Sequence, residues 1–274
     1  MGSSLFSAVF DTVRLWFLLQ SGKFAYIICV KMMDNKRFFP NRVWQFLLVV
    51  LLAMVASAPL FIMLGGVATT SQTVIFYAVI CAVFLLIVGA INWKRKVDIF
   101  GYYTRRLDSL WFGILIVVLI QLCITIPFSV VLDVHNAKDD NLWITAIGAI
   151  LLAPIFEESI FRGVFLRGLL TRYPETVTIV ITAIVFALIH VRLPQMVPGL
   201  MLGLLFVVVF ARTHSLIYTM LLHSVANAII IVSGLLPIAE FYYSLGKTVL
   251  IIICVASAAV VVYLSKVLIR RISR

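Results

Sequence analysis

The chain has 274 residues, of which 64% are hydrophobic and 12% charged, and its formal net charge at pH 7 is +11. Soluble domains seldom exceed about half apolar residues, so this composition excludes an ordinary soluble protein and indicates a multi-pass membrane protein. The basic residues cluster in loops at one membrane face, where anionic lipid head groups can contact them. The charge therefore calls for no nucleic-acid partner.

Residues 1–42 mix aromatic and basic side chains, and the spacing of Val9, Val13 and Trp16 is helical. We expect an interfacial amphipathic segment here. Asp11 and Arg14 interrupt the first apolar patch, which also lacks an A-x-A site, so no cleavable signal peptide is expected. The rest of the chain, 43–274, reads as a single transmembrane domain.

The remaining sequence contains eight apolar stretches, which predict an all-α bundle of about eight transmembrane helices. These stretches are Val43–Leu64, Thr73–Trp93, Leu110–Leu132, Leu142–Leu170, Thr176–His190, Met196–Ala211, Ser215–Leu235 and Thr248–Ile269. Pro154 removes a backbone donor from the fourth stretch and predicts a kink. Gly199 and Gly203 form a small-xxx-small pair that permits close helix contact on the sixth. The four cysteines read as buried free thiols.

Basic residues also predict the orientation of the helices. Nineteen of the 22 lysines and arginines fall before the first stretch, in alternate connections or in the tail. Because cytoplasmic loops are enriched in Lys and Arg, both termini should be cytoplasmic and the acidic loop Asp133–Asn141 should face outward. We expect a multi-pass protein of a bacterial plasma membrane.

The stretch from Ala153 to Gly163, APIFEESIFRG, places three charges within the fourth apolar stretch. Charges inside a membrane span are costly and mark functional sites that face protein or trapped water. Glu158 and Arg162 are four residues apart, so they share a helix face and can pair. Glu157 points about 100° away from Glu158 and remains available for other chemistry.

Two further polar clusters occur within apolar stretches. Phe186 and His190 close the fifth, and His223 and Asn227 lie four residues apart in the seventh. Counted from the predicted cytoplasmic ends at about 1.5 Å per residue, Glu157, His190 and His223 all reach a depth of roughly 15–22 Å. Three helices that bring ionisable groups to one depth predict a polar cavity in the middle of the membrane.

Two chemistries fit these side chains. In the first, Glu157 with His190 deprotonates a water that attacks a carbonyl, while His223 and Asn227 stabilise the oxyanion. In the second, Glu157, His190 and His223 bind a zinc ion whose fourth position holds water. Spacing cannot separate the two, because the side chains come from three different helices. We favour the metal-free version, with no required cofactor, because it gives all four groups a role.

The three motifs EESIFR, FALIH and HSVAN, in this order and spacing, resemble the CAAX prenyl protease type II and bacteriocin-processing family of intramembrane proteases. The resemblance covers about residues 142–231 and includes the FRG that follows the Glu pair. One departure is His214, where a glycine is common. The first three stretches and the tail carry no diagnostic residues.

The resemblance implies an eight-helix bundle whose membrane-embedded cavity cleaves peptides. It implies catalytic roles for Glu157, His190 and His223, Asn227 at the oxyanion, and support from Glu158 and Arg162, with Phe186 as the motif phenylalanine. The expected partners are the lipid bilayer and a membrane-associated peptide or protein, of CAAX or bacteriocin and pheromone type. A proton-coupled transporter and a non-enzymatic immunity protein are the alternatives, since both can carry ionisable residues at mid-membrane.

Overall fold

The computed structural model describes residues 38–67, 69–97, 104–133, 141–190 and 193–273, and every regular element in these ranges is helical. Within these ranges, seven helices are long and apolar enough to cross a membrane, and an eighth, α10, is apolar but shorter. The predicted all-α, multi-pass fold is confirmed. The interfacial helix expected in residues 1–42 lies almost wholly outside the described residues.

The helices follow the predicted order, and their bounds shift by a few residues. The first two are α3 (Val43–Met63) and α4 (Thr70–Lys94). The third span is α5 (Leu110–Ile120), η1 (Gln121–Thr125) and α6 (Ile126–Val131). The fourth is α7 (Leu142–Ile147), η2 (Gly148–Leu152), α8 (Ala153–Glu158), η3 (Ser159–Leu166) and α9 (Arg167–Leu170). Then come α10 (Glu175–Leu188), α11 (Leu193–Thr213), α12 (Leu216–Leu235), α13 (Ile238–Leu245) and α14 (Lys247–Ile272).

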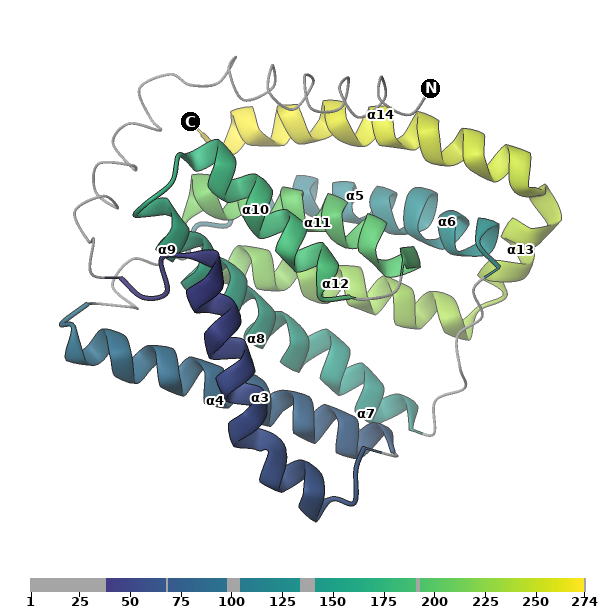
Figure 1. The fold of residues 1–274 in the computed structure, drawn as a ribbon. Helices are drawn as coiled ribbons and strands as arrows, with labels where there is room; N and C mark the ends of the chain where they lie inside the picture. The colour runs from purple at the N-terminus through teal and green to yellow at the C-terminus, as the bar shows by residue number, and fades with distance from the viewer. Residues whose placement is uncertain (1–37, 68, 98–103, 134–140, 191–192, 274) are drawn as a thin grey trace, which may run out of the picture.

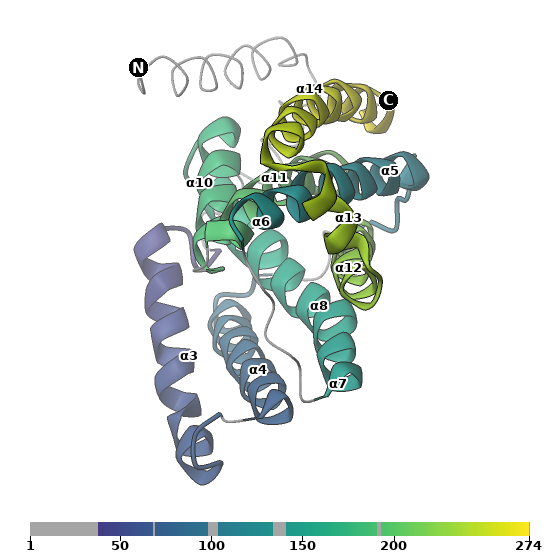
Figure 2. The ribbon, with the colours of Figure 1, turned by 90° about the vertical axis from the view of Figure 1, so that its right-hand side faces the viewer.

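The fourth span occupies the middle of the molecule. In both views it passes between α3 and α4 on one side and the group formed by α5, α11 and α14 on the other (Figures 1 and 2). α13 is a short helix that joins α12 to α14 at one end of the bundle (Figure 1). Charged residues of the fourth span are therefore surrounded by protein, as the cost of a charge in lipid requires.

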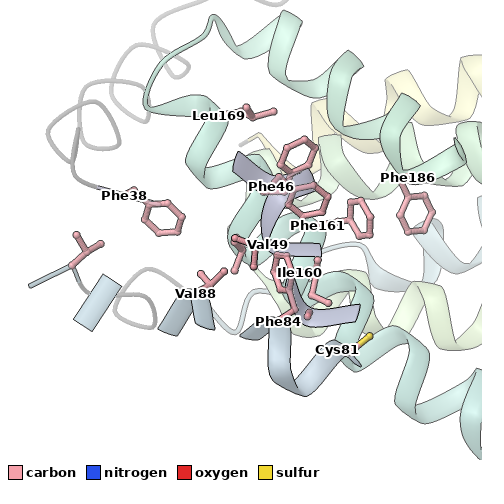
Figure 3. Close-up of a cluster of buried hydrophobic side chains, with 14 residues drawn as sticks. Phe38, Phe46, Val49, Cys81, Phe84, Val88, Ile160, Phe161, Leu169 and Phe186 are labelled. Carbon is pink, nitrogen blue, oxygen red and sulfur yellow. The ribbon is translucent and has the colours of Figure 1, made fainter. Parts of the chain in front are cut away.

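Separate apolar clusters hold the fourth span in place. One cluster joins α3 and α4 to η3 and α10, and its aromatic side chains pack against one another (Figure 3). There Phe46 stacks on Phe165 with ring centroids 4.1 Å apart and meets Phe84 at 5.4 Å. A second cluster joins α5, α11, α12 and α14. Because η3 also contacts α10 and α11, its polar residues are enclosed between two packed cores.

The spans contain three π-helical segments, which hydropathy did not predict. η1 ends two residues before Pro127, and η2 ends two residues before Pro154. A proline lacks a backbone N–H and its ring crowds the carbonyl four residues earlier, and a wider π turn relieves that conflict. The irregularity expected at Pro154 thus takes the form of a π turn. The third segment, η3, begins directly after Glu158, and π turns of this kind are frequent at functional sites.

α10 and α11 pack closely at the predicted small-xxx-small pair. A Cβ on Gly203 would lie 3.1 Å from Phe186 Cδ1, and one on Gly199 would lie 3.5 Å from His190 Nδ1. An added methyl group at Gly203 would require the Phe186 ring to shift, whereas one at Gly199 would make an ordinary contact. Gly203 therefore helps to set the position of the FALIH segment against α11.

The predicted basic connections meet at one end of the bundle. There Arg212 pairs with Glu175 at 3.5 Å, and the Thr104 amide donates to the His214 carbonyl at 3.0 Å. At the other end Lys247 pairs with Asp133. The count of basic residues from which the orientation was predicted included two arginines whose side chains are buried.

Arg162 and Arg167 were counted as lying at or near the connection between the fourth and fifth spans. Both side chains are buried, Arg162 completely. They leave the loop count because each packs within the protein, Arg162 on Glu158 and Arg167 over the Phe38 ring. The remaining asymmetry still supports the predicted orientation.

His214, the departure from the family pattern, occupies the connection between α11 and α12 with φ of 52°. Glycine adopts this left-handed conformation without steric cost, which explains why a glycine is common there. Burial and the nearby guanidinium groups of Arg167, Arg106 and Arg212 lower the pKa of His214 to about 4. The imidazole is therefore neutral at pH 7 and adds no further positive charge to this end.

The orientation can be tested by single cysteines on a Cys-free background. Ser244 at the end of α13 and Leu107 before α5 are both exposed, and they lie at opposite ends of the bundle. An impermeant thiol reagent should label Ser244→Cys in intact cells and Leu107→Cys only after lysis, because the basic end is predicted to face the cytoplasm. The reverse pattern would invert the topology.

Candidate active site

A fully buried ion pair lies at the centre of the site. Arg162 Nη1 donates to Glu158 Oε1 at 2.9 Å, and neither side chain is exposed. This is the contact that the four-residue spacing predicted. Arg162 Nη2 also donates to the Gly203 carbonyl at 3.2 Å, and the guanidinium lies over the Phe186 ring at 4.4 Å. The arginine thereby links the fourth span to α10 and α11.

His223 of α12 connects the two carboxylates. Its Nδ1 lies 2.9 Å from Glu158 Oε1, and its Nε2 lies 3.9 Å from Glu157 Oε2. The imidazole is buried between aromatic rings, with the Phe206 centroid at 5.6 Å and the Phe186 centroid at 6.0 Å. Because a carboxylate can only accept, Nδ1 carries a proton, which orients the ring and aims Nε2 at Glu157.

Glu157 is held by a residue that the sequence interpretation missed. Tyr77 of α4 donates its phenol hydroxyl to Glu157 Oε1 at 3.0 Å. The other carboxylate oxygen, Oε2, is buried and makes no hydrogen bond within the described ranges. Glu157 therefore keeps one oxygen for positioning and one oriented toward His223. Nothing in the sequence marks Tyr77, because a tyrosine in an apolar stretch reads as part of the core.

His190 contacts this cluster through the ring of Phe186, which packs against both His190 and His223. It lies two residues beyond the end of α10, and its Nδ1 contacts the Phe186 carbonyl at 2.9 Å. Its ring centroid lies 5.2 Å from that of Phe186, whose ring also contacts His223. Among the described residues, no hydrogen bond or ion pair joins His190 to Glu157. The contact that the structure shows is between Glu157 and His223, not between Glu157 and His190.

Asn227 lies one helical turn after His223, as expected from the four-residue spacing. Its side-chain Nδ2 donates to the Ala149 carbonyl in η2 at 2.7 Å. In a π turn the backbone carbonyls depart from the regular α-helical hydrogen-bond pattern. The Asn227 side chain therefore supplies a hydrogen-bond donor to a carbonyl of this turn. Asn227 therefore ties α12 to the segment that precedes the Glu pair.

A comparison with family models finds a match that includes the fourth span and most of α12. Residues 139–229 match the model described as "Rce1-like: Type II CAAX prenyl endopeptidase Rce1-like". Over this segment, about a third of its length, the chain is similar to the Rce1-like family. The searches of curated proteins and of solved structures found no match. The resemblance inferred from the three motifs is thus confirmed, and the match implies protease activity of the CAAX type at the level of the family.

The Rce1-like segment includes all the motif residues but not the whole cluster. It begins just before α7 and ends within α12, so it contains Glu157, Glu158, Arg162, Asn227 and the candidate histidines His190 and His223. Tyr77 of α4 and the apolar cluster formed with α3 lie outside it. The N-terminal helices therefore contribute directly to the environment of Glu157.

The alternative zinc site would require Glu157, His190 and His223 to lie close enough together to bind one metal ion. Across the described residues, no three His, Cys, Asp or Glu side chains gather closely enough to hold a metal ion. His190, the third ligand of the proposed set, contacts a backbone carbonyl with Nδ1. This arrangement does not fit the set Glu157, His190 and His223. The expectation that catalysis requires no metal remains a prediction.

Proposed function

We propose that this protein is an intramembrane endopeptidase that cleaves peptide bonds of membrane-associated peptides or proteins of CAAX type. The observation that carries the proposal is the pair formed by Glu157 Oε2 and His223 Nε2, which face each other at 3.9 Å. This distance is too long for a direct hydrogen bond. The two atoms are nevertheless close enough for both to contact one reacting group that lies beside them.

The charges of the cluster support distinct roles for this pair. Arg162 pairs with Glu158, so Glu157 has no cationic side chain of its own. An uncompensated charge is costly in a buried, membrane-embedded site, and a hydrogen-bond donor beside Glu157 Oε2 reduces that cost. With Nδ1–H held by Glu158 Oε1, the Nε2–H of His223 is directed at the reacting position.

The proposed reaction follows from these positions. Glu157 Oε2 accepts a proton from a water molecule as the water oxygen attacks the carbonyl carbon of the scissile bond. His223 Nε2–H donates to the carbonyl oxygen as it becomes negative. The proton held by Glu157 then passes to the amide nitrogen, the carbon–nitrogen bond breaks, and the carboxylate is restored. His190 and Asn227 are proposed to complete the site, Asn227 through the second Nδ2 hydrogen that its bond to the Ala149 carbonyl leaves available for the oxyanion.

The function is tested by comparing the membrane peptides of cells that carry the wild type or Glu157→Ala. Peptides that appear only with the wild type, and whose precursors accumulate with the variant, would identify substrates. A transporter or an immunity protein would behave differently, because Glu157→Ala would leave the peptide profile unchanged. Full complementation by a variant devoid of peptidase activity would also rule out proteolysis as the function.

Tyr77 is proposed to position Glu157. Tyr77→Phe removes only the hydroxyl, and a hydrogen bond to a charged group contributes about 1.5–3 kcal/mol. We expect kcat to fall by about 10-fold to 100-fold while KM changes little, because the contact orients the base and does not bind the substrate. The control is Tyr263→Phe, which removes the hydroxyl of an exposed tyrosine on α14. Equal kcat values for the two variants would refute the positioning role.

A further inference from the structure

A pocket separate from the candidate active site lies between α4 and α12. Its volume is about 440 Å³, within the range of about 300–1,000 Å³ typical of small-molecule sites. α4 and α12 form its walls and η3 its floor. Its lining residues are Leu85, Val88, Gly89, Thr104, Arg105, Ser159, Val164, Leu216, Ile217 and Met220. None of the candidate catalytic residues is among them. We refer to this pocket as the α4–α12 groove.

The wall of the groove is apolar apart from one charge. The two hydroxyl groups in the lining are used elsewhere, since Ser159 donates to the Ile155 carbonyl at 2.6 Å and Thr104 donates to the Thr213 carbonyl. Arg105 is exposed, and in the described part of the chain its guanidinium has no hydrogen bond or ion pair. The groove therefore combines an apolar channel with a single unpaired cation at one end.

The surroundings add to the positive charge at that end. Lys94 and Lys96, at the end of α4 that leads into the Arg105 connection, are both exposed. A row of basic residues at the end of a membrane helix attracts anionic lipid head groups. An apolar chain would fill the channel between Leu85 and Met220, and its head group would meet Arg105. A zwitterionic lipid would add a positive charge beside this arginine, which makes it the poorer match.

We propose that the α4–α12 groove binds an anionic phospholipid of the bilayer. One acyl chain lies along Leu85, Val88 and Met220, and the phosphate pairs with Arg105. This proposal does not depend on the peptidase function, because binding of the lipid requires no catalysis. The lipid site would be a second ligand site of the protein. It lies against the outer surface of η3, the π-helical segment whose Arg162 side chain is buried in the candidate active site.

The binding is tested in phosphatidylcholine vesicles that contain a trace of phosphatidylglycerol with a photoactivatable group in its acyl chain. After illumination, mass spectrometry of the digested protein should find the label on residues 85–89 and 216–220. The matched probe is phosphatidylcholine with the same photoactivatable chain. Phosphatidylglycerol should label the groove more strongly, and Arg105→Gln should reduce that preference about fivefold, the effect of one basic residue near the membrane surface. Arg270→Gln, at the exposed end of α14, should preserve the preference.

A second variant fills the groove. An added Cβ on Gly89 meets no atom within 4 Å, so Gly89→Leu can project into the groove without a clash, and leucine is the better helix former. It should abolish the labelling. Gly234→Leu in α12, also without a neighbour within 4 Å, is the control and should leave the labelling intact. Equal labelling by both lipids, persistence in Gly89→Leu, or displacement by a farnesylated CAAX peptide would overturn the assignment to a bilayer lipid.

Discussion

Replacing Glu157 by glutamine should lower the rate of peptide-bond cleavage by at least about 10²–10⁴-fold, the range that general-base catalysis contributes. Glutamine keeps the shape of the side chain and can still accept a hydrogen bond from Tyr77, but it cannot take the proton of the attacking water. The protein should stay folded, because Glu157 is not part of the fully buried Glu158–Arg162 pair. The measurement is kcat/KM on a peptide identified by the membrane-peptide comparison.

The same assay separates a catalytic unit from independent contributions. His223→Ala should cause a similar loss, and the double variant with Glu157→Gln should lose little more, because groups that act in one step are not additive. Asn227→Ala should retain more activity, about 10²–10³-fold below the wild type, as expected for one oxyanion donor. Glu175→Gln removes a carboxylate that pairs with Arg212 away from the site and should behave as the wild type. A folded Glu157→Gln protein with undiminished cleavage would refute the assignment.

The metal content of the purified, active protein tests whether catalysis requires a metal ion. Mass spectrometry of purified, active enzyme should find no stoichiometric zinc, and chelators should not reduce cleavage. The physical reason is that Glu157 Oε2 and His223 Nε2 already provide a base and a donor at one position. Stoichiometric zinc that disappears in His223→Ala would contradict this prediction.

The helices could be predicted from sequence because a membrane span leaves a strong compositional signal. A run of about 20 apolar residues is sufficient, whatever it packs against. The ion pair of Glu158 with Arg162 was also predictable, since both residues belong to one helix and local geometry sets their contact. The three motifs and their order indicated a resemblance to a protease family, and the family-model match over residues 139–229 confirms that resemblance.

The contacts between helices could not be predicted in the same way. The depth argument counted residues along each helix, which gives a depth in the membrane but does not say which side chains contact one another. Tyr77 comes from a helix without any motif, and only the packing of α4 against α8 brings its hydroxyl to Glu157. The π turns likewise depend on backbone strain at Pro127 and Pro154, to which hydropathy is insensitive.

Breaking the Glu158–Arg162 pair should have the largest effect on stability. Glu158→Gln leaves the guanidinium of Arg162 as an uncompensated buried charge, and removing one partner of such a pair costs about 3–5 kcal/mol. It also removes the charged acceptor of His223 Nδ1, which lies 2.9 Å away. We therefore expect a lower folded yield and a lower unfolding free energy in detergent than for Glu157→Gln. The exposed pair of Arg106 with Asp108 is the control, and Asp108→Asn should cost at most about 1 kcal/mol.

A double variant distinguishes stability from catalysis at this pair. Glu158→Leu with Arg162→Met replaces both charges by apolar groups, which in other buried pairs is neutral or stabilising by about 1–4 kcal/mol. Much of the stability lost in Glu158→Gln should return, because no unpaired charge remains. Cleavage should not return, because His223 Nδ1 has lost the carboxylate that orients its ring. If Glu158→Gln instead accumulates normally and unfolds like Asp108→Asn while losing activity, the pair is catalytic and its structural role is refuted.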